Sequence, residues 1–175
     1  MITLNKILLL KKPEMSDLEE LYILKNDEDS NALLGGFNTG YSKDSIKKWI
    51  LFHNEKTDEV LYIIQDIASG KLIGQVGFYN IDYRIGKAEF AILIADNFFR
   101  GKGFGDLCIK YMLTFGFNQL NLNRIELSLL SNNIKAMHLY NKNGFEQEGI
   151  QKQAQYKNGC YIDVILMAKF KENIK

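Results

Sequence analysis

A glycine-rich segment in the middle of the chain, RGKGFG at residues 100–105, has the composition of an anion-binding turn. Its three glycines stand at every second position, and apolar residues at near-helical spacing follow it as far as Gly116. A turn that leads into a helix presents free backbone N–H groups and the positive end of the helix dipole, and glycine lets an anion approach closely. The segment therefore predicts a phosphate cradle, flanked by Arg100 and Lys102.

Two other phosphate-binding patterns do not fit this turn. A P-loop needs a Lys-Ser or Lys-Thr pair after its last glycine, and none follows Gly105. The dinucleotide pattern G-x-G-x-x-G fails because the glycines are two residues apart. Taken alone, the segment leaves open a glycine-rich turn that binds no ligand.

A second segment, NIKAMHLYNKNGF at residues 133–145, adds to the first. Residues 100–105 contain Arg-x-x-Gly-x-Gly, which resembles the coenzyme A pyrophosphate loop of the GNAT N-acetyltransferase superfamily. Residues 133–145 resemble the second signature of that superfamily, N-x-x-A-x-x-x-Y-x-x-x-G-F. The most similar subgroup holds the spermidine N-acetyltransferases and the ribosomal-protein N-terminal acetyltransferases. The resemblance implies an N-acetyltransferase that uses acetyl-CoA as its co-substrate and needs no metal.

The same resemblance implies how the coenzyme is held. The strand at 90–94 is expected to separate from the strand at 126–130, so that the pantetheine arm pairs with exposed backbone. A backbone N–H near Leu93 would then help to hold the acetyl oxygen as it gains negative charge. The expected coenzyme-binding residues are Ile92, Leu93, Ile94, Arg100, Gly101, Lys102, Gly103, Phe104, Gly105, Asn133, Ala136 and Tyr140.

Tyr140 is the expected general acid. The resemblance places its side chain at the thioester sulfur. A phenol titrates at about 10, so it stays protonated at neutral pH and can return a proton to the departing thiolate. The alternative is an ordinary core tyrosine with a hydrogen-bonded hydroxyl group.

Glu89 is the expected base for the acceptor amine. An aliphatic amine titrates at about 10.4, so only about one molecule in 2,500 is neutral at pH 7, and deprotonation costs about 4.6 kcal/mol. A carboxylate that acts through ordered water eases this step. The alternatives are a surface glutamate paired with a lysine, proton removal by water alone, and Glu126 on the neighbouring strand as a weaker candidate.

Hydrophobic periodicity predicts the elements that must position these groups. Strands are predicted over residues 3–10, 60–67, 72–81, 87–95, 124–130, 148–155 and 161–170. Helices are predicted after a capping-box pattern at 16–19, after Ser42, between the glycine turn and Gly116, and from Asn133 to Gly144.

The order of these elements, together with the resemblance, implies one GNAT domain over residues 1–175. The implied α+β fold has a mixed, mostly antiparallel central sheet that is splayed at its two central strands, with helices on both faces. Gly74 and Gly77, inside a predicted strand, indicate a bulge or a close approach of the backbone there.

Composition excludes several classes of protein. A net charge of +1 gives no reason to expect a nucleic-acid partner, and the two cysteines and two histidines lack the spacing of a zinc site. No apolar run approaches the roughly 20 residues of a membrane-spanning helix, and no signal-peptide cleavage site follows the N-terminus. We expect a cytoplasmic enzyme without a membrane partner, in which the last hairpin is a candidate homodimer contact.

The acceptor is the least constrained part of the prediction. Residues 33–41, which match an acidic cluster of the spermidine enzymes, contain no carboxylate, although Asp27, Glu28 and Asp29 lie just upstream. This neutral segment favours the primary amine of a small metabolite such as an amino sugar. The alternatives are a protein or peptide α-amine, which titrates at about 7.7–8.0, a polyamine, and a non-catalytic module that only binds acetyl-CoA.

Overall fold

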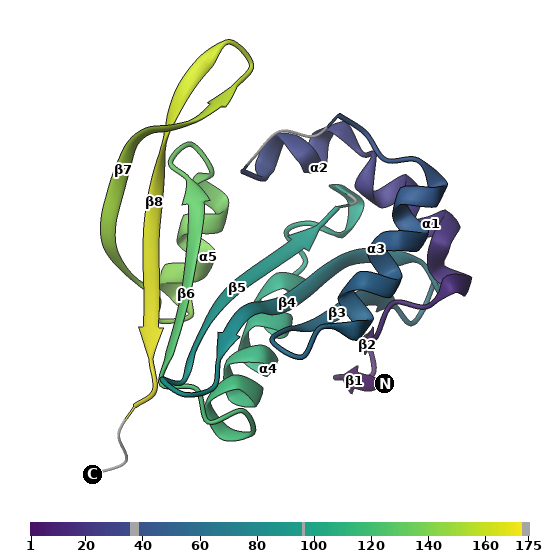
Figure 1. Ribbon diagram of the computed structural model, residues 1–175, viewed down its shortest axis with the longest axis horizontal. Coiled ribbons are helices and arrows are strands. Elements are labelled where there is room, and N and C mark those ends of the chain that lie inside the picture. The colour runs from purple at the N-terminus through teal and green to yellow at the C-terminus, as the bar shows by residue number, and fades with distance from the viewer. Residues whose placement is uncertain (36–38, 96, 173–175) are drawn as a thin grey trace.

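The residues predicted as strands assemble into an eight-stranded sheet in the computed structural model, which describes residues 1–35, 39–95 and 97–172. The strand order is β1-β2-β3-β4-β5-β6-β8-β7 (Figure 1). Neighbouring strands are antiparallel except for β5 and β6, which are parallel. The strands are β1 (Ile2–Leu4), β2 (Leu8–Lys11), β3 (Val60–Asp66), β4 (Leu72–Asp82), β5 (Lys87–Ile94), β6 (Arg124–Leu130), β7 (Glu146–Lys157) and β8 (Cys160–Phe170). The expected mixed, mostly antiparallel α+β fold is confirmed.

Helices cover both faces of the sheet, as expected (Figure 1). They are α1 (Leu18–Lys25), α2 (Glu28–Leu33), α3 (Lys43–Glu55), α4 (Phe104–Asn118) and α5 (Ile134–Lys142), with 3₁₀ turns η1 (Met15–Asp17) and η2 (Asn97–Phe99). Neighbouring residues of a strand point to opposite faces, which explains the two layers. Ile63 of β3 packs with α1 and α3, whereas Ile64 packs into the larger core with α4 and α5.

The two central strands, β5 and β6, are paired only at one end. Their register joins three residue pairs, the last of which is Glu89 with Glu126. Beyond this point β5 continues to Ile94 beside β4, and β6 continues to Leu130 beside β8. Figure 1 shows the two strands diverging toward the end that carries α2 and the β7–β8 hairpin. The predicted splay is confirmed.

Polar contacts close the base of this splay. The Gly86 carbonyl oxygen accepts hydrogen bonds from the backbone N–H groups of Asn123 and Arg124, at 2.6 and 3.0 Å. The Lys87 ammonium pairs with Glu126 at 2.7 Å, and the Arg124 guanidinium pairs with Glu126 at 2.9 Å. These hydrogen bonds and ion pairs join β5 to β6 at the start of the two strands. Beyond Glu89 and Glu126, the two strands are not paired with each other.

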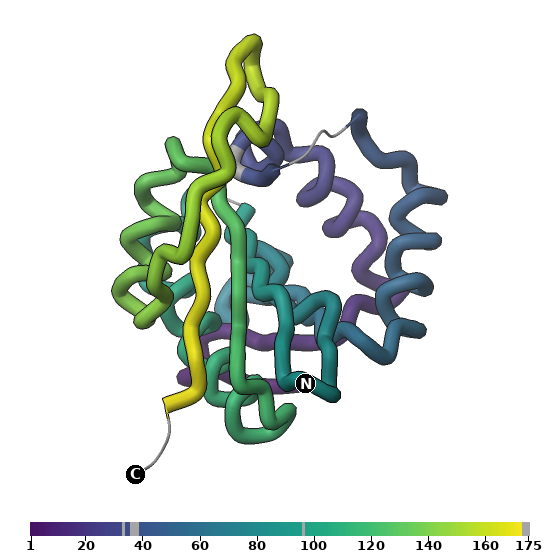
Figure 2. Tube along the Cα trace, turned by 60° about the vertical axis from the view of Figure 1, so that its left-hand side comes forward, coloured from purple at the N-terminus to yellow at the C-terminus, as the bar shows by residue number. Residues whose placement is uncertain are grey.

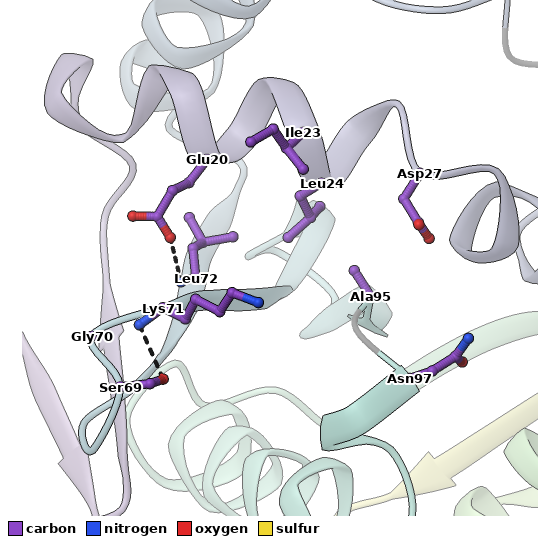
Figure 3. A pocket seen from close by; sticks show the side chains of 10 residues that line it. All are labelled: Glu20, Ile23, Leu24, Asp27, Ser69, Gly70, Lys71, Leu72, Ala95 and Asn97. Carbon is purple, nitrogen blue, oxygen red and sulfur yellow. Dashed lines mark hydrogen bonds between the residues drawn. The ribbon is translucent and has the colours of Figure 1, made fainter.

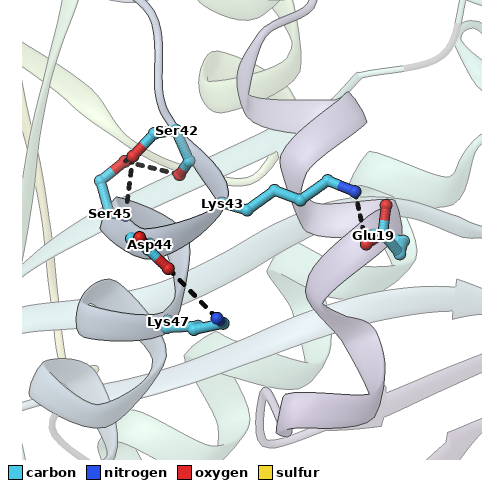
Figure 4. A network of polar contacts seen from close by, with 6 residues as sticks. All are labelled: Glu19, Ser42, Lys43, Asp44, Ser45 and Lys47. Atoms are coloured by element: carbon cyan, nitrogen blue, oxygen red, sulfur yellow. Dashed lines mark hydrogen bonds and ion pairs between the residues drawn. The ribbon is translucent and has the colours of Figure 1, made fainter.

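Helices α1 and α3 form one layer that packs against the sheet. As predicted, Ser42 caps α3, because its hydroxyl oxygen accepts a hydrogen bond from the Ser45 N–H at 3.1 Å. Lys43 of α3 pairs with Glu19 of α1 at 2.8 Å across the surface of this layer (Figure 4). The pair is exposed, so it orients the two helices but adds little to stability.

The strand predicted over residues 3–10 is wrong, because the structure divides it into β1 and β2. Asn5 and Lys6 have φ angles of 49° and 58°, in the left-handed region, and the chain reverses there. The Ile7 N–H donates to the Leu4 carbonyl oxygen at 2.9 Å and closes the turn. The apolar residues on either side resemble one continuous strand, and the two polar residues between them are the only local sign of the turn.

The capping box predicted at residues 16–19 is also wrong. The Asp17 carboxylate instead accepts a hydrogen bond from the Glu14 N–H at 2.9 Å and pairs with Lys11 of β2 at 2.6 Å. The capping box therefore lies two residues earlier, between Glu14 and Asp17 at the N-terminus of η1, and α1 begins at Leu18.

The close backbone approach predicted at the two strand glycines is confirmed. A Cβ atom at Gly74 would overlap the Leu93 carbonyl oxygen of β5, and one at Gly77 would lie 2.7 Å from the Val60 carbonyl oxygen of β3. Within the described residues, no helix is both long and apolar enough to cross a membrane.

Candidate active site

The glycine-rich turn leaves β5 through η2 and opens α4 at Phe104. Gly101 and Gly103 have φ angles of 75° and 84°, and a Cβ atom at either would meet no atom within 4 Å. Glycine adopts these left-handed angles without steric penalty. The backbone of the turn therefore borders open space instead of packed protein.

The backbone donors of this turn are available to a ligand. Within the part of the chain that the structure describes, the backbone N–H groups of residues 101–106 donate no hydrogen bond. Gly103 is the N-cap of α4, and it has no side chain that could accept a hydrogen bond from them. They lie at the positive end of α4, where an anion is stabilised. The Lys102 ammonium, 3.3 Å from the centroid of the exposed Phe98 ring, adds positive charge at this surface. The arrangement fits a pyrophosphate group, and the contact itself stays a prediction.

Arg100 is expected to flank the phosphates, but its guanidinium turns inward. It donates to the carbonyl oxygens of Ile94 at 2.7 Å and Ala95 at 2.8 Å, and to the Ser30 hydroxyl of α2 at 3.1 Å. These carbonyl groups lie where β5 ends, and one planar guanidinium can satisfy several acceptors at once. Arg100 therefore ties the turn to β5 and α2, and a contact between its side chain and phosphate stays a prediction.

The divergence of β5 from β6 exposes one edge of β5. The Ala95 N–H donates to the Ile73 carbonyl oxygen at 2.8 Å, and positions that are hydrogen-bonded in this way alternate along an antiparallel pair. Leu93 therefore also directs its backbone groups toward β4, whereas Ile92 and Ile94 direct theirs toward the gap. The N–H groups near Leu93 that face the gap are therefore those of Ile92 and Ile94, and a contact of either with the acetyl oxygen stays a prediction.

The two sequence motifs meet at the start of α4. A Cβ atom at Gly105 would lie 3.1 Å from the Leu139 side chain of α5, and the Asp106 carboxylate accepts a hydrogen bond from Lys142 at 3.0 Å. The hydrogen bond from Lys110, followed by those from α5, lowers the pKa of Asp106 to about 2. Sequence analysis missed Asp106, although its i, i+4 spacing to Lys110 is a recognisable signal.

Asn133 and Ala136 lie at the N-terminus of α5, as predicted. The Asn133 side-chain oxygen accepts a hydrogen bond from the Ala136 N–H at 3.2 Å, which confirms the predicted cap. This bond fixes the orientation of the Asn133 amide, because one of its two polar atoms is committed to the helix. A contact of either residue with the coenzyme stays a prediction.

Tyr140 lies beside the point where β5 and β6 separate. Its ring contacts the rings of Phe90 and Phe145, with centroids 6.4 and 5.7 Å away, and Phe90 is the first residue of β5 beyond the paired base. Tyr140 is only 7% exposed, and burial raises the pKa of its phenol to about 12. Its hydroxyl forms no hydrogen bond with any of the described residues. Among these residues, every fully buried side-chain nitrogen or oxygen atom has a hydrogen-bond partner, so an atom without one must be partly exposed. The hydroxyl is therefore not sealed inside the core.

Glu89 lies on the face of the sheet opposite the Tyr140 ring, because it precedes Phe90 in β5. Its side chain is exposed at the last paired position of β5 and β6. The alternative role for Glu89 is a surface ion pair with a lysine. The nearby Lys87 does not form that pair, because its ammonium pairs with Glu126. Glu126 is held between Lys87 and Arg124, which makes it less suited than Glu89 to accept a proton.

A half-buried lysine that sequence analysis missed lies on the same face as Glu89. Lys25, the last residue of α1, donates to the Gln75 side-chain oxygen of β4 at 3.0 Å. Its ammonium lies 3.8 Å from the centroid of the Trp49 ring on α3. Burial lowers the pKa of Lys25 to about 8. Nothing in the local sequence distinguishes this lysine from an exposed one, because only the fold brings β4 and α3 to it.

A separate hollow of about 490 Å³ lies between α1 and the turn that joins β3 to β4 (Figure 3). Glu20, Leu24, Leu72 and Asn97 are among its lining residues, and the Glu20 carboxylate accepts a hydrogen bond from the Leu72 N–H at 2.6 Å. Neither Tyr140 nor the glycine turn lines this hollow. It is therefore distinct from the site that the two motifs form.

Comparison with known proteins agrees with this geometry. A family model described as an acetyltransferase (GNAT) domain matches residues 10–166 of the chain. Spermidine N(1)-acetyltransferase of Vibrio cholerae serotype O1 is 34% identical over 172 residues, which cover 95% of this chain and 97% of that protein.

Solved structures agree as well. The crystal structure of spermidine N-acetyltransferase from Vibrio cholerae in complex with CoA and spermine superposes with a TM-score of 0.85 at 31% identity, covering 95% of this chain and 96% of that one. A dodecameric structure of the Vibrio cholerae enzyme superposes with a TM-score of 0.80 at 31% identity, covering 95% of each chain.

We expect Gly103→Val to weaken the binding of coenzyme A at least tenfold, because the added side chain crowds the backbone that would hold the pyrophosphate. Gly159→Val is a matched control, because Gly159 lies in the β7–β8 turn with a φ angle of 83° and nothing within 4 Å of a Cβ atom. Both variants should lose similar stability through backbone strain. Calorimetric titration with coenzyme A measures the dissociation constants, and equal values for the two variants would place the pyrophosphate elsewhere.

Proposed function

The chain belongs to the GNAT acetyltransferase family and is an acetyl-CoA-dependent N-acetyltransferase, and we propose that it acetylates the primary amine of a small molecule by direct transfer. The observation that carries the proposal is the divergence of β5 and β6 after Glu89, which brings the Ile92 backbone and the Tyr140 ring to one gap. The free N–H groups of residues 101–106 lie at the start of α4, close to α5.

Direct transfer is favoured because neither cysteine is placed to carry the acetyl group. Cys108 is fully buried in the core, and burial raises the pKa of its thiol to about 12. A thiol with such a pKa is a poor nucleophile at neutral pH. Cys160 is exposed at the start of β8, in the hairpin beyond the body of the sheet (Figure 2). The acceptor nitrogen therefore attacks the thioester carbonyl itself.

In this mechanism Tyr140 acts as the general acid. As the nitrogen–carbon bond forms and the carbon–sulfur bond breaks, the phenol gives its proton to the thiolate. Burial keeps the phenol protonated well above neutral pH, so the proton is available throughout the usual working range. The Ile92 N–H is directed toward the same gap and can donate to the acetyl oxygen as that oxygen gains negative charge.

Glu89 is the base that we propose for the acceptor. Its exposed carboxylate lies where β5 and β6 part, on the face that α1 and α3 also cover. From there it can take the amine proton through water while Tyr140 acts from the other side of the sheet. Glu89 then accepts the proton that the nitrogen loses, and Tyr140 donates the proton that the sulfur gains. Each residue therefore has a single role in the transfer.

Two classes of acceptor have specific support. The similarity to spermidine N(1)-acetyltransferase over almost the whole chain favours a polyamine. An amine that is not a polycation is favoured because residues 33–41 contain no carboxylate, and two of the three carboxylates just upstream form contacts within the fold. Asp27 caps α2 by accepting from the Ser30 N–H, and Asp29 accepts from Asn97, so these two carboxylates are engaged within the fold.

An acceptor panel tests this function. The wild-type chain should release free thiol from acetyl-CoA with at least one of spermidine, cadaverine and glucosamine, and mass spectrometry should find the singly acetylated amine. A peptide with a free α-amine serves as the comparison. Thiol release with the peptide alone, or with none of the amines, would contradict a small-molecule acceptor.

We expect Tyr140→Phe to lower kcat by about 100- to 1,000-fold and to leave the affinity for coenzyme A nearly unchanged, because only the proton donor is removed. Tyr111→Phe is the matched control, since Tyr111 is a half-buried phenol of α4 that stacks on Phe115. Steady-state kinetics with the best amine of the panel measures both. Normal turnover with a large loss of coenzyme affinity would show that Tyr140 acts only in binding.

A further inference from the structure

A second hollow, of about 620 Å³, lies between the C-terminal half of α4, the end of α5 and the end of β8. Its volume is within the range of small-molecule sites, roughly 300–1,000 Å³. It extends along α4 from Lys110 to Asn118, about 12 Å at 1.5 Å per residue. Neither Tyr140 nor residues 101–105 line it, so it is distinct from the candidate active site.

Four lysines from α4, α5 and the end of β8 line this hollow: Lys110, Lys142, Lys169 and Lys171. Lys110 and Lys142 share one carboxylate, that of Asp106, at 2.9 and 3.0 Å. Among the described residues that line the hollow, Glu172 is the one with an acidic side chain. The four lysines, Asp106 and Glu172 together carry four positive and two negative charges, which leaves a surplus of +2.

The surplus charge lies at the β8 end of the hollow, on two half-buried lysines. Lys171 donates to the side-chain oxygen of Asn121 at 3.2 Å, and this amide is neutral. Lys169 forms no ion pair and no side-chain hydrogen bond with the part of the chain that the structure describes. Its ammonium lies beside Gly144, where a Cβ atom would come within 2.5 Å of it. The C-terminal end of α5 favours a cation here, but a helix end carries only about half a charge.

Apolar side chains form another part of the wall. Leu113 and Phe117 of α4 line the hollow, and so does Phe170, the last residue of β8, whose side chain is 52% exposed. The Arg124 guanidinium lies 5.2 Å from the centroid of the Phe170 ring, a contact that helps to hold the ring in place. A ligand that fits this hollow therefore combines an anionic group with an apolar or aromatic group.

We propose that this hollow binds a phosphomonoester that carries an aromatic group, the class to which nucleoside monophosphates belong. A phosphomonoester has a charge of about −1.5 to −2 at pH 7, which matches the surplus of +2, whereas a carboxylate compensates only half of it. The phosphate oxygens accept hydrogen bonds from the ammonium groups of Lys169 and Lys171. The aromatic group lies against Phe170. This site goes beyond the proposed function, because binding here involves neither acetyl-CoA nor the acceptor amine.

Calorimetric titration of AMP and UMP into protein saturated with coenzyme A tests this proposal, because the coenzyme then occupies the glycine turn, its proposed site. We expect at least one nucleotide to bind at least tenfold more tightly than both its nucleoside and inorganic phosphate. Lys169→Met combined with Lys171→Met should weaken this binding at least tenfold. Lys43→Met combined with Lys47→Met removes two exposed lysines of α3, outside the hollow, and should leave the binding unchanged.

Three results would overturn the proposal. The first is a nucleotide that binds no more tightly than inorganic phosphate, or not at all, which would mean that the lysines hold an adventitious ion only. The second is nucleotide binding that persists in the double variant of Lys169 and Lys171. The third is binding that occurs only without coenzyme A, which would assign the nucleotide to the glycine turn. The first and third comparisons use the wild-type chain, so they hold even if the double variant is unstable. Acetyl transfer is not measured, so failure here leaves the proposed function intact.

Discussion

The incomplete pairing of β5 with β6 is the constraint on which the rest of the site depends. Parallel strands normally continue side by side, but here hydrogen bonding stops after three residue pairs. Ion pairs between Lys87, Glu126 and Arg124 close the base of the sheet, while aromatic rings and α5 occupy the side where the strands diverge. One edge of β5 is thereby left to pair with something other than protein.

That single divergence places groups from distant parts of the chain around one gap. Phe90 begins the separated part of β5, and Tyr140 of α5 packs on it. At the far end of β5, Arg100 binds the carbonyl groups of Ile94 and Ala95 and so sets the position of the glycine turn. The glycine turn and the Tyr140 phenol are therefore related through β5 itself, which brings the two sequence motifs to the one site that we propose.

Much of this arrangement could be predicted from the sequence, since the glycine turn, the Asn133 cap and most strands have strong local signals. The division of the first strand at Asn5 and Lys6 could not, because the turn interrupts an otherwise continuous apolar pattern. The inward guanidinium of Arg100 and the burial of Lys25 could not either. Arg100 reaches Ser30 of α2 and Lys25 reaches Gln75 of β4, both far along the chain, and no local pattern specifies which lysine or arginine the fold will enclose.

The crystal structure of this chain with bound coenzyme A is the most direct test of the central claim. The account predicts pyrophosphate oxygens within hydrogen-bonding distance of the N–H groups of residues 101–106, with the pantetheine arm beside Ile92. The thiol sulfur should then lie within about 3–4 Å of the Tyr140 hydroxyl, as proton transfer requires. A coenzyme bound in the hollow beside Glu20, or a sulfur on the far side of β6, would contradict it.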